Sequence, residues 1–298
     1  MIEEKKERSA YFYALLAVFF WSTAATSFKI ALRYLDVTVL LFLASVVSAL
    51  ILLGILISQK KLKMLLTLSL RSKLSSISLG VLNPFIYYIM LFQAYRMLPA
   101  QLAQPLNFIW PLMIVILAVP FLGKKLKGIE IIAILVSFTG VIIISTKGSF
   151  TSFRGADPGG IVLALSTSII WALFWLLNVK NSKDDIIKLF LNFSSGSLLI
   201  FLFLLIRGVK LNLSLPGILG AVYIGMFEMS LTFNFWLKAL KLSPSPARIN
   251  NFIYLTPFLS LLVISLILKE KILISTVLGL VLIISGIILQ HRIKKVPV

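Results

Sequence analysis

Ten apolar segments follow one another along the whole chain, and each is about as long as a membrane span. A bilayer core about 30 Å thick needs roughly 20 apolar residues per helix, and backbone groups in lipid must find hydrogen-bond partners within the segment. The runs also lack the short alternating pattern of a membrane β-barrel. The sequence therefore predicts an all-α polytopic membrane protein with ten transmembrane helices. They are expected at about residues 11–31, 38–58, 74–95, 100–122, 128–146, 159–179, 186–206, 216–239, 245–268 and 272–290.

The composition excludes a soluble globular fold and several kinds of chemistry. Charged residues make up 13% of the 298 residues, which is about half of the roughly 25% that a soluble domain carries. The chain has no Cys and a single His, which removes Cys-ligated metal sites, His clusters and Ser-His-Asp catalysis from the membrane core. No phosphate-binding loop of the Walker type occurs, which argues against ATP-driven transport. We therefore expect no enzyme activity, no catalytic residues, no metal and no cofactor.

The positive charge is distributed as membrane insertion would place it. The net charge is +19, and the Lys and Arg residues cluster in short loops between the apolar runs. With the N-terminus inside, the loops predicted to be inside hold 19 Lys and Arg residues, and the loops predicted to be outside hold 8. This bias predicts a multi-pass protein of the cytoplasmic membrane with both termini in the cytoplasm. The basic inner loops are expected to meet anionic membrane lipids, and we expect no nucleic-acid partner.

The chain divides into two similar halves of five predicted helices each. A loop that contains Gly, Ser, Asp and Pro lies midway and is typical of a linker. Because five is odd, the second copy enters the membrane in the opposite orientation, which is the inverted-repeat design of secondary transporters. We predict a first five-helix repeat over residues 1–147, a linker over 148–158 and a second five-helix repeat over 159–298. Residues that match at offsets of 145 to 150 include Trp21 with Trp171, Gly80 with Gly225, Pro111 with Pro257, and Gly140 with Gly286.

Polar and aromatic side chains gather near the middle of the third, fourth and ninth predicted spans. Polar groups in hydrocarbon are costly, so they normally face a cavity or the protein interior. Prolines in these spans, such as Pro84 and Pro105, remove backbone hydrogen bonds near mid-helix, and broken helices near the midplane commonly bind the substrate. A packing kink would explain one proline alone, whereas prolines with amides and aromatic rings favour a lined cavity. The predicted substrate-binding residues are Asn83, Tyr87, Tyr88, Gln104, Asn107, Trp110, Asn250 and Tyr254.

Three charged residues within the spans are candidates for coupling transport to an ion. Glu228 is the only carboxylate near the centre of a span, so it could carry a coupling proton, remain neutral, or pair with Lys29 or Arg248. Lys29 lies near the outer end of the first span, and Arg248 lies in the first turns of the ninth. Both could extend their charged ends to the membrane surface, or one of them could meet an anionic group of a substrate.

Five motifs follow one another along the chain. They are A-L-L-A-V-F-F-W-S-T with Lys29 in the first span, N-F-I-W-P-L-M in the fourth, F-I-Y-L-T-P-F in the ninth, L-K-E-K-I at Leu268–Ile272 and G-L-V-L-I-I-S-G at Gly279–Gly286. In this order and spacing, the chain resembles the drug/metabolite transporter superfamily, in its ten-helix form built from two EamA-type domains. The W-S-T at Trp21–Thr23 and the N-F-I-W-P at Asn107–Pro111 look most like the aromatic amino acid exporter branch.

The resemblance implies a basket-like fold, with the first four helices of each half around a central cavity and the fifth and tenth helices outside. It also implies export of small metabolites, often amino acids. Two features depart from the family pattern: Lys124 replaces the acidic residue usual after the fourth helix, and the second helix lacks an early Arg. Gly140 and Gly286 suit close packing of the fifth and tenth helices, which could be scaffold or dimer-contact helices. We therefore expect a monomer or a homodimer.

The sequence thus predicts a secondary transporter that exports a small molecule by alternating access, with amino acids as the leading substrate class. Two alternatives stay open. A phosphorylated-metabolite or nucleotide-sugar exchanger would need several cations in the cavity, where only Lys29 and Arg248 are available. An integral membrane enzyme acting on a lipid would need paired carboxylates or a His at the membrane surface, and the pair Asp184 and Asp185 lies in a loop that also contains Lys.

Overall fold

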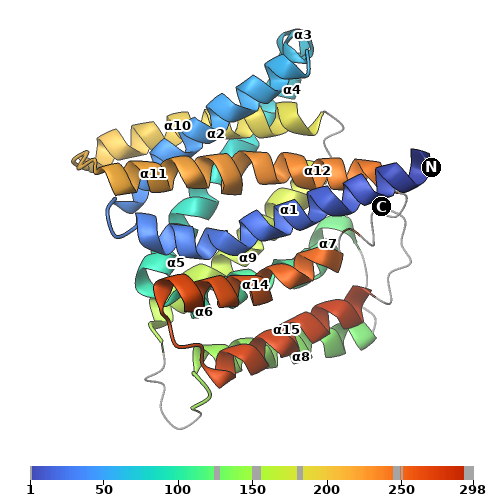
Figure 1. Ribbon diagram of the computed structural model, residues 1–298, viewed down its shortest axis with the longest axis vertical. Coiled ribbons are helices and arrows are strands. Elements are labelled where there is room, and N and C mark those ends of the chain that lie inside the picture. Colours follow the sequence, from blue (N-terminus) through green and yellow to red (C-terminus); the bar gives the residue numbers. More distant parts are fainter. Residues whose placement is uncertain are drawn as a thin grey trace.

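The computed structural model describes residues 2–123, 128–149, 156–179, 184–243, 249 and 251–291, and all regular structure in these residues is helical (Figure 1). The elements in chain order are α1 (Ile2–Ala31), α2 (Val37–Ser58), α3 (Leu62–Thr67), α4 (Leu70–Gly80), η1 (Val81–Ile86), α5 (Tyr87–Met97), α6 (Ala100–Asn107), α7 (Trp110–Leu122), α8 (Gly128–Ser145), α9 (Pro158–Val179), α10 (Asp185–Arg207), α11 (Leu215–Tyr223), η2 (Ile224–Leu231), α12 (Thr232–Leu242), η3 (Phe252–Leu255), α14 (Thr256–Val263), η4 (Ile264–Leu268) and α15 (Ile274–His291).

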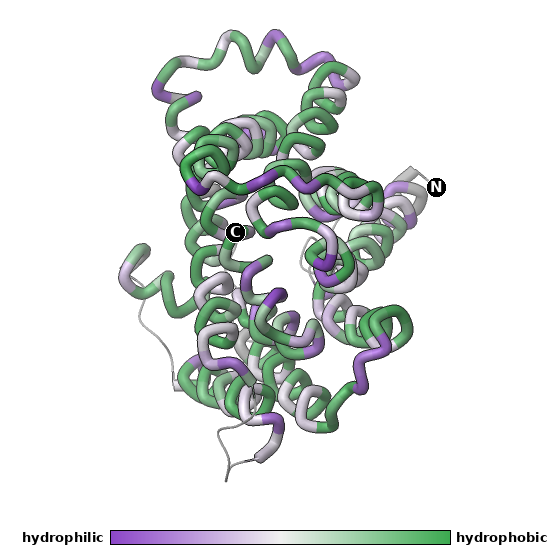
Figure 2. The backbone as a smooth tube through the Cα atoms, turned by 90° about the vertical axis from the view of Figure 1, so that its left-hand side faces the viewer, coloured by the Kyte–Doolittle hydropathy of each residue, from purple (hydrophilic) through white to green (hydrophobic). Residues whose placement is uncertain are grey.

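The helices coincide with the predicted spans. Eight helices are long and apolar enough to cross a membrane, and two shorter apolar helices, Phe252–Leu268 and Ile274–Leu289, follow them in the described part of the chain. The third span runs over Lys73–Met97, within two residues of the predicted segment at each end. Figure 2 shows apolar residues along the helices and hydrophilic residues mainly at helix ends and in connections. The chain is therefore an all-α polytopic membrane protein.

The first helix of each half packs against helices of the other half. Helix α1 packs against α12 and α14 of the second half, and α9, the first helix of the second half, packs against α5, α6 and α7 of the first. The second helices of the two halves, α2 and α10, pack against each other, as do the fifth helices, α8 and α15. These two pairs lie towards opposite ends of the long axis in Figure 1. The two repeats are thus interleaved rather than stacked as separate lobes.

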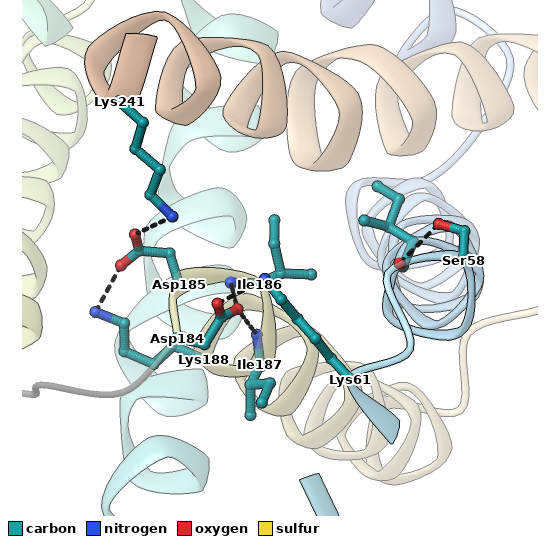
Figure 3. Close-up of polar contacts among 9 residues, drawn as sticks. Ser58, Lys61, Asp184, Asp185, Ile186, Ile187, Lys188 and Lys241 are labelled. Carbon is teal, nitrogen blue, oxygen red and sulfur yellow. Dashed lines mark hydrogen bonds and ion pairs between the residues drawn. The ribbon is translucent and has the colours of Figure 1, made fainter. Parts of the chain in front are cut away.

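One face of the bundle carries a group of ion pairs between its helix ends (Figure 3). The Nζ atom of Lys61 lies 2.6 Å from Oδ2 of Asp184, and Asp185 lies 2.9 Å from Lys188 and 3.9 Å from Lys241. We call this the Lys61 face. Helix α1 begins and helix α15 ends on the same side of the bundle (Figure 1).

The opposite face holds its own charged contacts, and we call it the Glu270 face. Arg96 lies 3.6 Å from Asp36 there, ahead of α2. Arg207, the last residue of α10, donates a hydrogen bond of 3.1 Å to the hydroxyl of Thr38 in the first turn of α2. Helix α2 therefore begins at the face where α10 ends. Because the second helices of the two halves run in opposite directions, the repeats are inverted.

Glycines allow α8 and α15 to approach closely. A Cβ atom added at Gly140 of α8 would lie 2.4 Å from the carbonyl oxygen of Gly279 in α15. A Cβ atom added at Gly286 of α15 would lie 2.5 Å from the carbonyl oxygen of Ala133. Both distances are too short for a side chain, so the contact between these helices depends on residues without one. The expected close packing of the fifth and tenth helices is present.

The third and fourth helices of each half are interrupted near mid-span. In the third span, η1 separates α4 from α5, and Asn83 within it has non-helical backbone angles (φ −143°, ψ 116°). In the eighth span, η2 occupies the equivalent place between α11 and α12. In the fourth span, α6 and α7 are separate helices, and in the ninth η3 precedes α14. Single π-helical turns and broken helices in a membrane bundle commonly mark functional sites.

Candidate functional site

A hydrogen bond at mid-membrane depth joins the two halves through their third helices. The hydroxyl of Tyr88, at the start of α5, donates to Oε1 of Glu228 at 3.2 Å. Glu228 lies near the middle of the span Leu215–Leu242 and within the interrupted segment η2. Tyr88 is fully buried. The interruption η2 of the second half therefore contacts α5 of the first half, which directly follows η1.

A second chain of hydrogen bonds lies beside this contact. The hydroxyl of Tyr87 donates to Oδ1 of Asn107 at 3.4 Å, and Nδ2 of Asn107 donates to Oγ1 of Thr167 at 2.8 Å. Thr167 in turn donates to the carbonyl oxygen of Ala164 in its own helix. Asn107 ends α6 of the first half, and Thr167 lies in α9 of the second half. The hydrogen bonds Tyr88–Glu228 and Asn107–Thr167 thus both join residues of different halves.

Aromatic rings connect these polar groups to the rest of the interior. The ring of Tyr87 lies 4.8 Å from that of Tyr88 and 4.7 Å from that of Trp171. Trp171 and Trp21, which match at an offset of 150, both contact the ring of Phe233, at 5.9 Å and 5.6 Å. Such rings offer large apolar contact area with defined geometry. The site is therefore bounded by aromatic side chains from both halves.

Two polar residues, Glu228 and Asn83, have buried side-chain atoms without a hydrogen-bond partner among the described residues. Oε2 of Glu228 is inaccessible and unpaired, and so are both side-chain polar atoms of Asn83. The two residues match at an offset of 145, so they occupy equivalent positions in the interrupted segments η2 and η1. Buried polar groups are normally hydrogen-bonded, and unpaired ones call for a functional explanation.

Other predicted site residues make different contacts. Gln104 accepts a hydrogen bond from the hydroxyl of Tyr95. Lys29 donates to the carbonyl oxygens of Tyr95 and Leu98 at 2.8 and 2.9 Å, at the end of α5. A cation suits that position because the carbonyl groups at the end of a helix carry partial negative charge. Among the described residues, the hydrogen-bond partner of the Glu228 side chain is Tyr88, not Lys29.

The remaining predicted residues lie where the fourth and ninth spans are interrupted, or outside the described part of the chain. Trp110 begins α7 and contacts the ring of Phe108 at 6.4 Å. Tyr254 is half-buried in η3. Arg248 and Asn250 lie outside the described residues, as do residues 150–155 of the predicted linker. The structure thus unites Tyr87, Tyr88, Asn107 and Glu228 in one group.

Thr167 and Phe233 contact residues of the candidate site, and sequence reasoning did not select them. A threonine and a phenylalanine are ordinary residues of membrane helices, so neither differs from packing residues in composition. A signal existed for Thr167, because it lies one helical turn before Trp171, the residue that matches Trp21 in the repeat. Among the described residues, no group of three or more His, Asp or Glu side chains could hold a metal ion.

Comparison with known proteins places this geometry in a family. Residues 8–146 and residues 158–290 each match the EamA-like transporter family. An uncharacterized transporter of Clostridium kluyveri is 27% identical over 297 residues, which cover 97% of this chain and 94% of that protein. An uncharacterized transporter of Archaeoglobus fulgidus is 25% identical over 281 residues, covering 93% of this chain and 96% of that protein.

A solved structure supports the fold. The crystal structure of a protein that is 17% identical superposes with a TM-score of 0.66, covering 96% of this chain and 97% of that one. At this identity the likeness concerns the fold alone. The family match and the relatives point to a transporter rather than an enzyme. Because the two matches together span most of the sequence, the chain belongs to the EamA-like transporter family.

Proposed function

We propose that the chain is a secondary transporter that exports small metabolites, with amino acids as the leading class, by alternating access. The observation that carries the proposal is the hydrogen bond between Tyr88 and Glu228. It joins the interrupted third helices of two inverted halves at mid-membrane depth. A site placed between inverted repeats can be opened to either side when the halves change their relative orientation.

The chemistry of the group suits a small zwitterion. Glu228 offers a carboxylate oxygen without a partner, which would accept from a substrate ammonium group. Asn107 and Tyr87 offer polar groups for orientation, and helix α7 begins nearby at Trp110, where the positive end of its dipole favours an anionic group. The rings of Tyr87 and Trp171 would contact an apolar or aromatic side chain. These features favour aromatic amino acids as the first substrates to test.

The phosphorylated-metabolite alternative is less consistent with the site. Such substrates carry two negative charges and are usually bound by several cations. Of the two cationic candidates, Lys29 is engaged by carbonyl oxygens at the end of α5. The contacts that define the group come from tyrosine, asparagine, threonine and glutamate. An uncharged or zwitterionic substrate therefore fits better than a phosphate ester.

We also propose an orientation and a location. The Lys61 face would be cytoplasmic and the Glu270 face external, in the cytoplasmic membrane, because the loops at the Lys61 face hold most of the Lys and Arg residues. Both termini would then be cytoplasmic. Glu228, with its unpaired oxygen, is the candidate carrier of a coupling proton.

Counterflow in proteoliposomes tests the proposal. Vesicles loaded with one unlabelled amino acid at a time are mixed with a trace of the same labelled compound, with and without a pH gradient. We expect accumulation of label for at least one amino acid, and inhibition by the others that share the site. No accumulation across the full panel would contradict the amino acid assignment.

A further inference from the structure

The first turn of α6 is capped by a residue from the other half of the chain. Oε1 of Glu270 accepts from the backbone N–H of Ala100 at 3.0 Å, and Oε2 accepts from the N–H of Gln101 at 3.2 Å. The residue that precedes α6, Pro99, provides no side-chain cap. The first N–H groups of a helix lack partners within it and favour a negative charge. Glu270, in the loop that links η4 to α15, supplies both the hydrogen-bond acceptors and the negative charge.

The side chain of Gln101, in the first turn of α6, also forms hydrogen bonds with residues of the second half. Its Nε2 donates to the carbonyl oxygen of Lys271 at 2.9 Å, and its Oε1 accepts from the N–H of Leu273 at 3.0 Å and from the hydroxyl of Thr276 at 3.3 Å. The Gln101 residue is 7% exposed. Five hydrogen bonds therefore fasten the first turn of α6 to the second half at the Glu270 face.

Helix α6 links this connection to the candidate site. It is a separate helix of 8 residues, bounded by Pro99 and by the interruption at Phe108. Gln104 lies at its centre, and Asn107, its last residue, donates to Thr167. A helix this short moves as one body. A change in how Glu270 holds its first turn would therefore change the position of Asn107 in the site.

The first half carries a lysine at the position equivalent to Glu270. At the offset of 146 that pairs Pro111 with Pro257, Glu270 matches Lys124. An ammonium group donates hydrogen bonds and accepts none, so Lys124 has no means of capping the N–H groups of a helix. The comparison with Lys124 rests on the sequence, because that residue lies outside the described part of the chain. A carboxylate at this position is therefore specific to the second half of the sequence.

We propose that Glu270 and Gln101 are positioning residues that keep the candidate site closed towards the Glu270 face. They hold the first turn of α6 against the second half, and release of these hydrogen bonds lets α6 move and exposes the site from that side. The inference rests on the proposed transport function for its purpose, but its test does not need a substrate.

The test measures how quickly a buried position on α6 reacts with a maleimide. The chain has no native cysteine, so Ala103→Cys would introduce a single thiol at a fully buried position two residues beyond Gln101. In this background, Glu270→Ala removes both caps and Glu270→Gln retains one acceptor. Loss of a charge-assisted hydrogen bond to a buried helix end should raise the labelling rate by about tenfold or more, because such bonds are stronger than neutral ones. We expect Glu270→Gln to fall between Glu270→Ala and the parent.

Asp157 offers a matched control. Its Oδ1 accepts from the N–H of Gly160 at 3.0 Å, so it also caps a helix at the Glu270 face, but within its own half. We expect Asp157→Ala to leave the labelling rate of the thiol at position 103 unchanged. An equal rise in this variant would show general loosening and overturn the proposal, as would an unchanged rate in Glu270→Ala.

A fallback variant and two further outcomes keep the positioning role of Glu270 and the proposed transport function separate. If Glu270→Ala does not yield folded protein, Glu270→Gln and Gln101→Leu decide the matter, since the second removes three hydrogen bonds and leaves the carboxylate in place. If labelling responds as expected but the parent transports no amino acid, the connection stands and the substrate assignment fails. If the parent transports an amino acid but labelling does not respond, the positioning role fails and the transport function stands.

Discussion

The ammonium group of Lys61 donates a hydrogen bond of 2.6 Å to the carboxylate of Asp184, and this pair joins the end of α2 to the start of α10 (Figure 3). The other carboxylate oxygen of Asp184 accepts from the N–H groups of Ile186 and Ile187, which caps α10. One side chain therefore fastens the two halves at the Lys61 face and begins the second helix of the second half.

The two roles of Asp184 can be separated by substitution. Asp184→Asn keeps an oxygen for the cap and removes the charge that faces Lys61, so we expect a loss of up to about 1 kcal/mol in the free energy of unfolding. Asp184→Ala also removes the cap and should cost about 1 kcal/mol more. Thermal unfolding in one detergent compares the two variants. Identical midpoints would show that the cap contributes nothing.

The Asp184 carboxyl also predicts a dependence on pH. Burial alone would raise the pKa of this carboxyl, but the hydrogen bond and charge of Lys61, with the N–H groups of Ile186 and Ile187, outweigh burial and lower it. The stabilisation is therefore complete above the unfolded-state pKa of about 3.9 and is lost as the pH falls through the lower folded-state pKa. We expect the thermal midpoint to fall more steeply below about pH 4 in the parent than in Asp184→Asn. Parallel curves would exclude this linkage.

The contact between α8 and α15 should not tolerate a methyl group at Gly140. Its Cβ would lie 2.4 Å from a backbone oxygen, so Gly140→Ala must push the helices apart and should destabilise by about 1–3 kcal/mol. Gly54→Ala is the matched control, because nothing lies within 4 Å of the added Cβ and the residue is inside α2. That change should be neutral or stabilise by about 0.5–1 kcal/mol. Thermal unfolding of both variants decides whether the close approach matters.

The hydroxyl of Thr167 should matter for substrate affinity. Thr167→Val keeps the shape but leaves Nδ2 of Asn107 without its acceptor, a change that costs about 1–3 kcal/mol when the group is buried. We expect the apparent KM for counterflow to rise about tenfold. Ser168→Ala is the control, because Ser168 donates only to the carbonyl of Leu165 in its own helix. A similar KM for Thr167→Val and the parent would remove Asn107 from the site.

Glu228 should be needed for proton-driven transport rather than for folding. Glu228→Gln keeps an acceptor for the Tyr88 hydroxyl and removes the ability to carry a proton. We expect a folded protein that performs counterflow but no longer responds to an imposed pH gradient. Asp157→Asn, a carboxylate outside the site, should keep the pH response. An undiminished response in Glu228→Gln would assign Glu228 a structural role.

Span positions could be predicted from the sequence because they depend on apolar length alone. A helix in lipid needs about 20 apolar residues whatever its neighbours are, and the third span shows how closely this fixes its ends. The clustering of mid-span polar side chains was also predictable, since Tyr87, Tyr88, Asn107 and Glu228 lie together. Their role in substrate binding or coupling stays a prediction.

Partners could not be predicted, because they depend on which helices meet. Asn107 finds its acceptor in α9 because each first helix packs in the opposite half. Glu228 finds its donor in α5, which belongs to the third helix of the other half. Lys29 finds carbonyl oxygens rather than a carboxylate, and backbone carbonyls leave no trace in a residue sequence. Pro84 indicates the interruption η1 in the sequence, whereas η2 contains no proline and was not predicted, because hydropathy reports the polarity of a segment and not its hydrogen-bond pattern.

The exchange of first helices has a consequence for how the protein is made. Thr23 of α1 contacts the hydroxyl of Tyr223 in α11, a residue 200 positions later, at 2.6 Å. At a synthesis rate of about 5–20 residues per second, α1 leaves the ribosome roughly 10–40 s before its neighbour exists. During that interval the hydroxyl of Thr23 can bond to the carbonyl oxygen of Phe20 in its own helix but not to Tyr223. A nascent chain stopped before α11 would therefore hold its first helix in contact with α5 and α6 but without α11, α12 and α14, against which most of that helix packs.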